Sequence, residues 1–466
     1  MSISAGRAVR AAALVIGVVG AFFVAAAPAS ATPGFARQTG LACEACHTVF
    51  PELTPFGRLF KFNGYVFSNV GQLQDINVKK ESTLALPQVA PIAVQLQASN
   101  TTLGHSIPDT GTPAVTDLSQ KNQAQFPQAL SIFYTGKISD NLGAFLQLTW
   151  TPDGNSVGID NSELRFANHG SLPSLGASDF IYGVTLNNNP TSQDVWNSTP
   201  AWGYPFITSN VAVGPIASAL LDGNLAQTAV GLGGYLWAYN HVYLEFSGYR
   251  SGNTSFSNST TGGPGPLDST FGPRISGVAP YWRAAWEQDW ARNSLTFGTF
   301  GIKADTHPKG TGEHGPTDSQ TDVALDAQYQ YIGDPNIFSA YLTWIHEDRD
   351  FNATAAANPH NTLSTLRLSG SYFYNRTLGG SLQFFSTTGS TDATLYAPAA
   401  VVGSASGSPD TRGLIAELDY LPWLNTKLGL QYTAYFKFNG ASTNYDGSGR
   451  NASDNNTLFA FIWTAF

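Results

Sequence analysis

Hydrophobic and polar residues alternate with a period of two along most of this chain. Between positions 89 and 99, Ile92, Val94 and Leu96 fall on one face, and Gln95 and Gln97 fall on the other. The pattern returns in segments 142–150, 242–250, 323–331, 338–346, 365–374, 414–420 and 428–438. Segments of about ten residues with alternating hydrophobicity are typical of the strands of a transmembrane β-barrel.

The connections between these segments alternate between short and long. Short polar connections fall at 139–141, 239–241, 291–293, 333–336, 375–377 and 421–425, with a longer one at 168–178. Long Gly-, Ser- and Asn-rich loops fall at 100–125, 187–224, 251–277, 306–320, 348–361, 389–410 and 439–455. Short periplasmic turns opposite long extracellular loops characterise outer-membrane barrels, whereas a soluble β-sandwich or propeller has no such asymmetry.

The sequence therefore predicts an all-β fold with a small helical segment before it. Residues 85–466 are predicted to form a porin-like antiparallel barrel of about 16 strands in the bacterial outer membrane, in contact with its lipid. Both chain ends are predicted on the periplasmic side. The third long loop, 187–224, is the longest, and we expect it to fold into the lumen.

Aromatic residues gather at the predicted strand ends. Trp237, Trp286, Trp290 and Trp423 stand at the ends next to short turns, where they would form one of the two aromatic girdles of a membrane barrel. The chain closes on an uncharged segment, 458–466, that ends in Phe466. This ending resembles the assembly signal of outer-membrane proteins.

The N-terminal 80 residues follow a different pattern. Arg7 and Arg10, an apolar run at 11–27 and an Ala-Ser-Ala site at 29–31 predict a signal peptide at 1–31, which places the mature chain outside the cytoplasm. Residues 32–80 are predicted to form a small helical head. Within it, Thr54 is a helix N-cap candidate, Pro55 suits the first helical position, and Gly64 suits the position after the helix. Phe56, Leu59 and Phe60 would share one apolar face.

The chemistry of the chain is concentrated in the pentapeptide 43–47, Cys-Glu-Ala-Cys-His. This is the attachment motif of a c-type haem, in which Cys43 and Cys46 form the covalent links and His47 ligates the iron. The chain has only these two cysteines. A disulfide-exchange motif is a weaker reading, because no βαβ pattern surrounds the cysteines and His47 would have no role in it. One c-type haem is the predicted cofactor.

The sixth ligand of the haem iron is open. Methionine is a common sixth ligand in cytochromes c, but the only methionine is Met1, inside the predicted signal peptide. His241 and His169, near periplasmic turns, and His105, in an outer loop, are weak candidates, and a five-coordinate haem is the alternative. No catalytic triad or paired-acid arrangement is visible, so we expect no catalytic side chain.

The head segments 33–40 (PGFARQTG), 43–47, 51–58 (PELTPFGR) and 63–65 (NGY) resemble the fused monohaem cytochrome–porins of iron-oxidising bacteria. The third-loop segments 189–191 and 196–203 (WNSTPAWG) are similar to theirs as well. The resemblance implies oxidation of extracellular Fe(II) and delivery of one electron to a periplasmic cytochrome or copper carrier. A transport porin with a structural or sensory haem, or the same conduit with another extracellular donor, are the alternatives.

Charge adds little to this picture. Charged residues make up 12% of the chain and the formal net charge is −9. No basic run is interleaved with aromatic residues, so a nucleic-acid partner is not expected.

Overall fold

The computed structural model describes residues 34–67, 90–107, 120–152, 156–171, 180–252, 255–256, 274–308 and 315–466. The predicted signal peptide at 1–31 and the predicted boundary between head and barrel, at 80–85, lie outside these residues.

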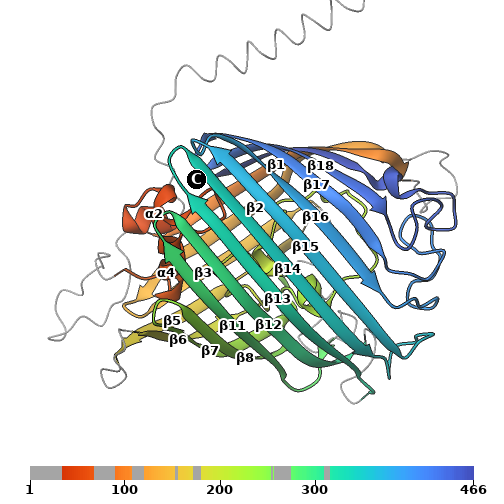
Figure 1. The fold of residues 1–466 in the computed structure, drawn as a ribbon, viewed down its shortest axis with the longest axis horizontal. Helices are drawn as coiled ribbons and strands as arrows, with labels where there is room; N and C mark the ends of the chain where they lie inside the picture. Colours follow the sequence, from red (N-terminus) through yellow and green to blue (C-terminus); the bar gives the residue numbers. More distant parts are fainter. Residues whose placement is uncertain are drawn as a thin grey trace, which may run out of the picture.

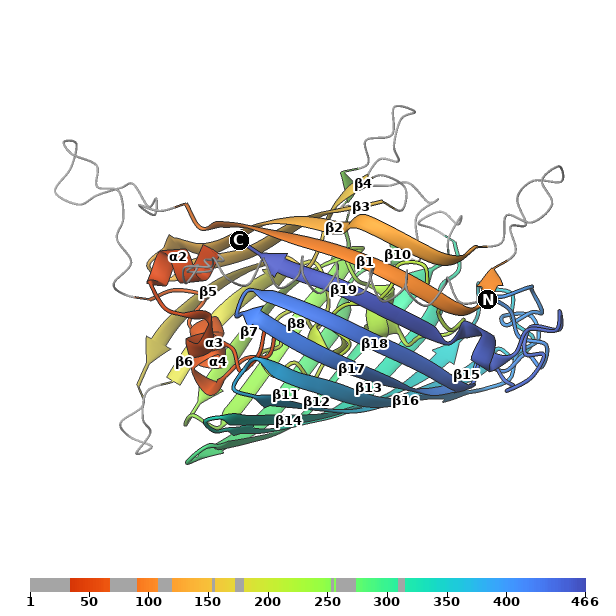
Figure 2. The same cartoon turned by 90° about the horizontal axis from the view of Figure 1, so that it is seen from above.

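Sixteen antiparallel strands of 8–20 residues close into a single barrel, as predicted (Figures 1 and 2). Each strand pairs with the next along the chain, and β1 closes the barrel on β19, where Gln97 lies opposite Trp463. The wall strands are β1 (Ile92–Ile107), β2 (Gln120–Ser139), β3 (Leu142–Thr151), β5 (Glu163–Gly170), β6 (Phe180–Asn187), β7 (Ala229–Ala238), β8 (Val242–Ser251), β11 (Ala279–Trp290), β12 (Asn293–His307), β13 (Asp318–Ile332), β14 (Asn336–Asp350), β15 (His360–Tyr374), β16 (Leu378–Gly389), β17 (Thr411–Trp423), β18 (Thr426–Lys437) and β19 (Thr457–Ala465).

Three shorter strands extend the sheet. They are β4 (Ser156–Ile159), β9 (Ser255–Phe256) and β10 (Arg274–Ile275). β4 continues the pairing of β5 with β3, and β9 pairs only with β4. These segments therefore lengthen the wall on the side of the long loops.

Three helices lie at the end of the barrel where β1 begins and β19 finishes (Figure 2). They are α2 (Gly34–Thr39), α3 (Cys43–Cys46) and α4 (Pro55–Phe62), and we refer to residues 34–67 as the plug. Short helical turns occur at η3 (Pro200–Trp202), η4 (Leu220–Asn224) and η5 (Ala452–Asn455). No helix among the described residues has the length and apolar character needed to cross a membrane.

The wall has a polar inner face and an apolar outer face. In β13, Asp322, Asp326 and Gln328 are buried in the lumen, whereas Val323 and Leu325 are exposed on the outside. Successive side chains of a strand point to opposite faces, so the period of two in the sequence separates lipid-facing from lumen-facing positions. This arrangement is that of a barrel surrounded by lipid.

The short turns have the backbone geometry that tight hairpins require. Tyr239 and Asn240 both have φ near 58°, and Asn375 and Arg376 have φ of 54° and 53°. Two consecutive residues with positive φ match the twist of the flanking strands. The predicted turns at 239–241 and 375–377 are confirmed. The loop predicted at 100–125 is wrong at both ends, because β1 continues to Ile107 and β2 begins at Gln120.

Helix α4 begins as predicted but buries a different face. The Thr54 side chain accepts a hydrogen bond from the Gly57 amide at 3.1 Å, and Gly64 follows the helix with φ of 69°. Phe56 and Leu59 are each 41% exposed. The buried positions include Arg58, Lys61 and Phe62, because polar lumen residues bind the two cations, so the predicted Phe56–Leu59–Phe60 face is wrong except at Phe60.

One predicted girdle residue also faces inward. Trp286, Trp290 and Trp423 are exposed, but Trp237 is buried and stacks on Phe62 at 4.7 Å. Trp237 belongs to a cluster of apolar side chains between the plug and the wall. The plug thus buries an aromatic residue that the sequence pattern assigns to the lipid interface.

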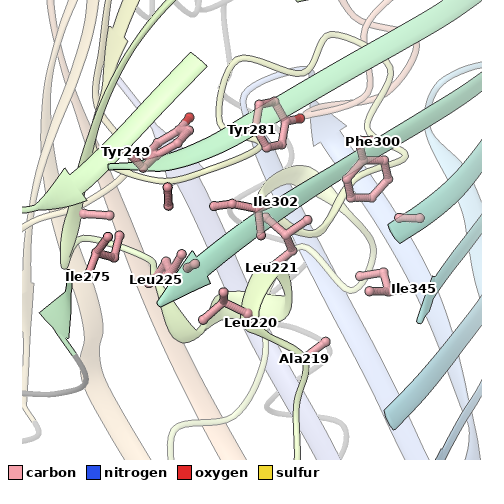
Figure 3. Close-up of a cluster of buried hydrophobic side chains, with 14 of the residues drawn as sticks. Ala219, Leu220, Leu221, Leu225, Tyr249, Ile275, Tyr281, Phe300, Ile302 and Ile345 are labelled. Atoms are coloured by element: carbon pink, nitrogen blue, oxygen red, sulfur yellow. The ribbon is translucent and has the colours of Figure 1, made fainter. Parts of the chain in front are cut away.

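The third long loop folds into the lumen, as predicted. Figure 3 shows Leu220 and Leu221 of η4 among Tyr281, Phe300 and Ile302 of β11 and β12. The amide of Leu220 donates to Glu347 of β14 at 2.6 Å, and the amide of Leu221 donates to Asp322 of β13 at 2.7 Å. These carboxylates fix the loop to strands that are not its sequence neighbours.

Arg58 fixes the plug to the wall. Its guanidinium is 3.0 Å from the Glu287 carboxylate and donates to Gln330 at 2.8 Å and Ser294 at 2.6 Å. Arg58 is 1% exposed, so its charge is stabilised by these groups and not by water.

We expect Arg58→Met to loosen the plug, because it leaves the Glu287 carboxylate buried without its cation. Breaking a buried ion pair in this way costs about 3–5 kcal/mol. Limited trypsin digestion should then cut after Lys61, which is buried in the native protein. Adding Glu287→Gln to Arg58→Met should restore part of the protection. Equal protection of Arg58→Met and the native protein would contradict the role of Arg58.

Candidate functional site

A cavity of about 440 Å³ lies between the plug, the wall and the third loop. We call it the inner chamber. Its size falls in the range of roughly 300–1,000 Å³ found for ligand and cofactor sites. The plug contributes Cys43, Cys46 and His47 to its lining, so the three residues of the motif face one space. Aromatic side chains supply much of the remaining lining: Phe35, Phe50, Phe60, Tyr65, Phe67, Phe133, Phe145, Trp202, Phe206 and Trp463.

The local fold places both thiols on one helical turn. Cys43 and Cys46 are the ends of α3, and the His47 amide donates to the Cys43 carbonyl at 2.9 Å. Residue 47 then leaves the helix in an extended conformation and forms a bridge with Leu53. The turn of α3 and the bridge together direct the two thiols and the imidazole to the chamber.

The surroundings of the motif keep its groups uncharged. Burial lowers the pKa of His47 to about 4, and His47 borders the chamber. Burial also raises the pKa of Cys43, and it raises the pKa of Cys46 to about 11. Reactive thiols of disulfide-exchange proteins have lowered pKa values, and burial shifts the pKa values of Cys43 and Cys46 in the opposite direction.

These residues fit a c-type haem. Two thiols three positions apart, an imidazole beside them and an aromatic chamber would provide the covalent links, the axial ligand and the apolar surroundings of a porphyrin. Cys43 and Cys46 are not joined by a disulfide.

Close packing of α4 on α3 fixes the motif in place. A Cβ atom at Gly57 would lie 2.2 Å from the Cys46 carbonyl oxygen, so only glycine permits this approach. The Thr54 hydroxyl donates to the Ala45 carbonyl at 2.8 Å, and the Thr54 amide donates to the Cys46 carbonyl at 2.9 Å. The cap of α4 therefore also holds the turn that carries the thiols.

Aromatic contacts lead from His47 to the wall. The His47 and Phe50 rings are 5.1 Å apart, and Phe50 meets Trp463 of β19 edge to face at 4.9 Å. Phe50 and Phe206 both pack on a cluster formed by Ile207, Phe459, Phe461 and Trp463. The Phe50 ring thus connects His47 to β19, and the apolar cluster on which it packs also contacts the third loop.

Lys61 ties the plug to the third loop. Its ammonium donates to the Ser192 and Asp194 carbonyls, both at 2.8 Å, and lies 5.2 Å from the centre of the Trp202 ring. Burial lowers the pKa of Lys61 to about 8, although the Glu163 carboxylate, 3.8 Å away, opposes the shift. The Lys61 side chain therefore holds the plug and the third loop together beside the inner chamber.

Arg165 of β5 completes the connection. It pairs with Glu163 at 2.7 Å and donates to the Lys61 and Gln193 carbonyls at 3.2 and 2.8 Å. The Tyr65 hydroxyl donates to Glu163 at 2.6 Å. One side of the chamber is therefore a continuous polar network of plug, wall and loop.

None of the three candidate sixth ligands lines the inner chamber. His241 lies in the turn between β7 and β8, and its ring stacks on the ring of Trp286 in β11. The His241 Nδ1 atom is 2.8 Å from the Glu287 carbonyl oxygen. His169 is exposed near the end of β5, and His105 is exposed on β1, not in a loop as expected. Among the described lining residues His47 is the one histidine, so the sixth ligand stays open.

A second cavity, of about 610 Å³, lies in the lumen on the side of the long loops. We call it the outer vestibule. Amide and hydroxyl side chains of the wall dominate one side, including Gln383, Gln431 and Thr433, and third-loop residues form the other. Arg367 pairs there with Asp222 at 2.7 Å. The described part of the chain holds no group of three His, Cys, Asp or Glu side chains suited to bind a metal ion directly.

Several site residues are not revealed by the periodicity of the sequence. Arg58, Lys61 and Trp202 act through partners more than a hundred positions away, so local periodicity does not reveal them. A partial signal exists at Arg58 and Lys61, since cations on an otherwise apolar helix invite a search for buried carboxylates.

No protein-family model and no curated protein sequence matches the chain. Solved structures similar to it include the outer membrane channel DcaP of Acinetobacter baumannii, with a TM-score of 0.43 and 13% identity over 80% of this chain and 96% of that one. OmpT of Vibrio cholerae has a TM-score of 0.41 and 10% identity, covering 80% and 96%. OmpF of Salmonella typhi, in complex with daunomycin, has a TM-score of 0.42 and 13% identity, covering 80% and 97%.

We expect Gly57→Ala to reduce covalent haem attachment. Alanine inside a helix normally stabilises it by about 0.5–1 kcal/mol relative to glycine. Here the new methyl group would meet the Cys46 carbonyl and displace the turn that carries both thiols. Haem staining of the denatured protein, divided by the amount of protein, measures attachment. Gly158→Ala, with open space around its Cβ, should stain like the native protein. Equal staining of Gly57→Ala would contradict the packing argument.

Proposed function

We propose that the protein is an outer-membrane cytochrome–porin that takes one electron from extracellular Fe(II) and passes it to a periplasmic carrier. The observation that carries the proposal is the position of the motif. Cys43, Cys46 and His47 line an aromatic chamber inside the short-turn end of a closed barrel. The short-turn end of such barrels is periplasmic and the long-loop end is extracellular.

The haem, when bound through Cys43 and Cys46, supplies a one-electron Fe(III)/Fe(II) couple, which matches the one-electron oxidation of Fe(II). His47 holds an uncharged imidazole at the chamber, ready to ligate. Phe50, Phe60 and Phe206 exclude water from the surroundings of the motif, and a dry chamber favours the less charged state of a redox centre. The chain's own residues would therefore bind the haem, orient it and keep it in apolar surroundings.

The inner chamber also has an edge suited to an electron carrier. Leu41 and Ala42 line the chamber and are exposed at the end of the barrel. A soluble periplasmic cytochrome or copper protein can approach this edge without entering the lumen. The proposed electron exit is therefore next to α3, on the side opposite the long loops.

We expect anaerobic Fe(II) to produce the reduced α-band in protein purified from outer membranes. The Cys43→Ala/Cys46→Ala variant should show no covalent haem and no such band. Dithionite serves as the control that reports the total reducible haem. A haem that dithionite reduces and Fe(II) does not would contradict the iron function, and a native protein without covalent haem would contradict the cytochrome assignment.

A further inference from the structure

We propose that residues 200–206 of the third loop form a septum that stops ions between the outer vestibule and the inner chamber, and that electrons cross it at Tyr204 and Phe206. The inference rests on the proposed function and adds the place where the extracellular donor stops. The donor class is a small hydrated cation that gives up one electron.

The first support is that the two cavities share a wall. Pro200, Ala201, Gly203 and Pro205 line both the inner chamber and the outer vestibule. Trp202 lines only the inner chamber, and Tyr204, two positions further on, lines only the vestibule. The segment therefore lies between the two cavities.

The second support is that the loop around this segment is attached to the wall on several sides. Gln383 of β16 donates to the Tyr204 carbonyl at 2.6 Å, and Thr343 of β14 donates to the Ser198 carbonyl at 2.6 Å. Gln128 of β2 donates to the Thr208 carbonyl at 2.9 Å. Because the attachments come from strands far apart around the barrel, the segment crosses the lumen and does not lie along one side.

Prolines and packed rings give the septum its rigidity. Pro200 and Pro205 fix their own φ angles, which reduces the conformations open to the segment. The Trp202 indole donates to the Ser192 carbonyl at 2.6 Å, and its ring meets Phe145 of β3 edge to face at 5.6 Å. An ion would have to displace these packed rings to pass.

The third support is a series of aromatic rings across the septum. Tyr204 borders the vestibule, and its ring centre is 5.6 Å from that of Phe206, which borders the inner chamber. Phe206 packs on the same apolar cluster as Phe50, whose ring is 5.1 Å from His47. Electron tunnelling weakens steeply with distance through a gap, and bonded or contacting rings shorten the gap.

The vestibule suits transient contact with a hydrated cation. Gln383, Gln431 and Thr433 present neutral oxygen atoms, which accept hydrogen bonds from the water shell of an ion without replacing it. The described residues of the vestibule include no group of three His, Cys, Asp or Glu side chains that could bind an ion directly. A haem held by Cys43, Cys46 and His47 would accept the one electron that the donor gives up, and no proton or atom would be transferred.

Conductance tests the septum without any electron donor. The haem-loaded protein in planar bilayers should show no steady ion conductance, and Trp202→Ala/Tyr204→Ala should open one. The matched control, Trp286→Ala/Tyr372→Ala, removes an indole and a phenol from the lipid-facing surface and should stay closed. Heat-dependent gel mobility confirms that each barrel is folded.

Two results would overturn the septum. A native protein that already conducts would show that the lumen is open. A folded Trp202→Ala/Tyr204→Ala variant that stays closed would show that the plug, and not residues 200–206, blocks the lumen.

Stopped-flow haem reduction tests the crossing point. With Fe(II) added to the loop side of reconstituted vesicles, Tyr204→Leu should slow reduction at least severalfold, and the conservative variant Tyr204→Phe, which keeps the ring, should rescue the rate. Tyr372→Leu, on the lipid-facing surface, is the control. An unchanged rate in Tyr204→Leu, or equal losses in Tyr204→Leu and Tyr204→Phe, would overturn the assignment of Tyr204.

The same assay separates this inference from the proposed function. Hexaammineruthenium(II), a membrane-impermeant one-electron donor, replaces Fe(II) in a parallel series. If it reduces the native protein and is slowed by Tyr204→Leu while Fe(II) reduces nothing, the iron function fails and the crossing point stands. If Fe(II) reduces the native protein and both Tyr204 variants equally, the function stands and the crossing point fails.

Discussion

Three buried arginines hold the interior of this barrel together. Arg58 of the plug, Arg165 of β5 and Arg283 of β11 are nearly inaccessible to water, and each pairs with a carboxylate inside the lumen. A buried charge without a partner is strongly unfavourable, so Arg58 and Arg283, whose carboxylate partners come from other segments, are stable only while those segments keep their relative positions. Arg283 illustrates this dependence, because Asp194 of the third loop and Asp326 of the wall both contact it, at 3.1 and 2.9 Å.

These ion pairs determine how the space inside the barrel is filled. They hold the plug at one end and the third loop across the middle, so two cavities, the inner chamber and the outer vestibule, lie on either side of residues 200–206. Trp196, fully buried between Arg283 and the plug residue Phe62, fills the region where the two inserted segments meet. The plug and the third loop therefore share one packed region inside the wall.

The sequence predicts the wall well because the wall obeys a local rule. Each strand contributes alternate side chains to lipid and lumen, and each short turn needs residues that accept positive φ, so both features are visible within about ten residues. The packing of the residues inside the barrel follows no such short sequence pattern. Lys61 is buried because Ser192, Asp194 and Trp202 lie around it, and Trp237 turns inward because Phe62 stacks on it. These partners are distant in sequence, which is why the apolar face of α4 and one girdle residue were predicted wrongly.

The haem motif can be predicted from the sequence only in part. Its chemistry is evident from five residues, but its setting depends on tertiary contacts. Gly57 shows the difference: in the sequence it is an unfavourable residue in the first turn of a helix, and in the structure its missing Cβ lets α4 touch the Cys46 carbonyl. The thiols and the imidazole therefore reach the chamber through backbone packing, which no side-chain pattern records. Because α4 also carries Arg58 and Lys61, the helix that positions the motif is the helix that the wall and the third loop bind. The position of the proposed redox centre is thus set by the same buried ion pairs that attach the plug and the third loop to the wall.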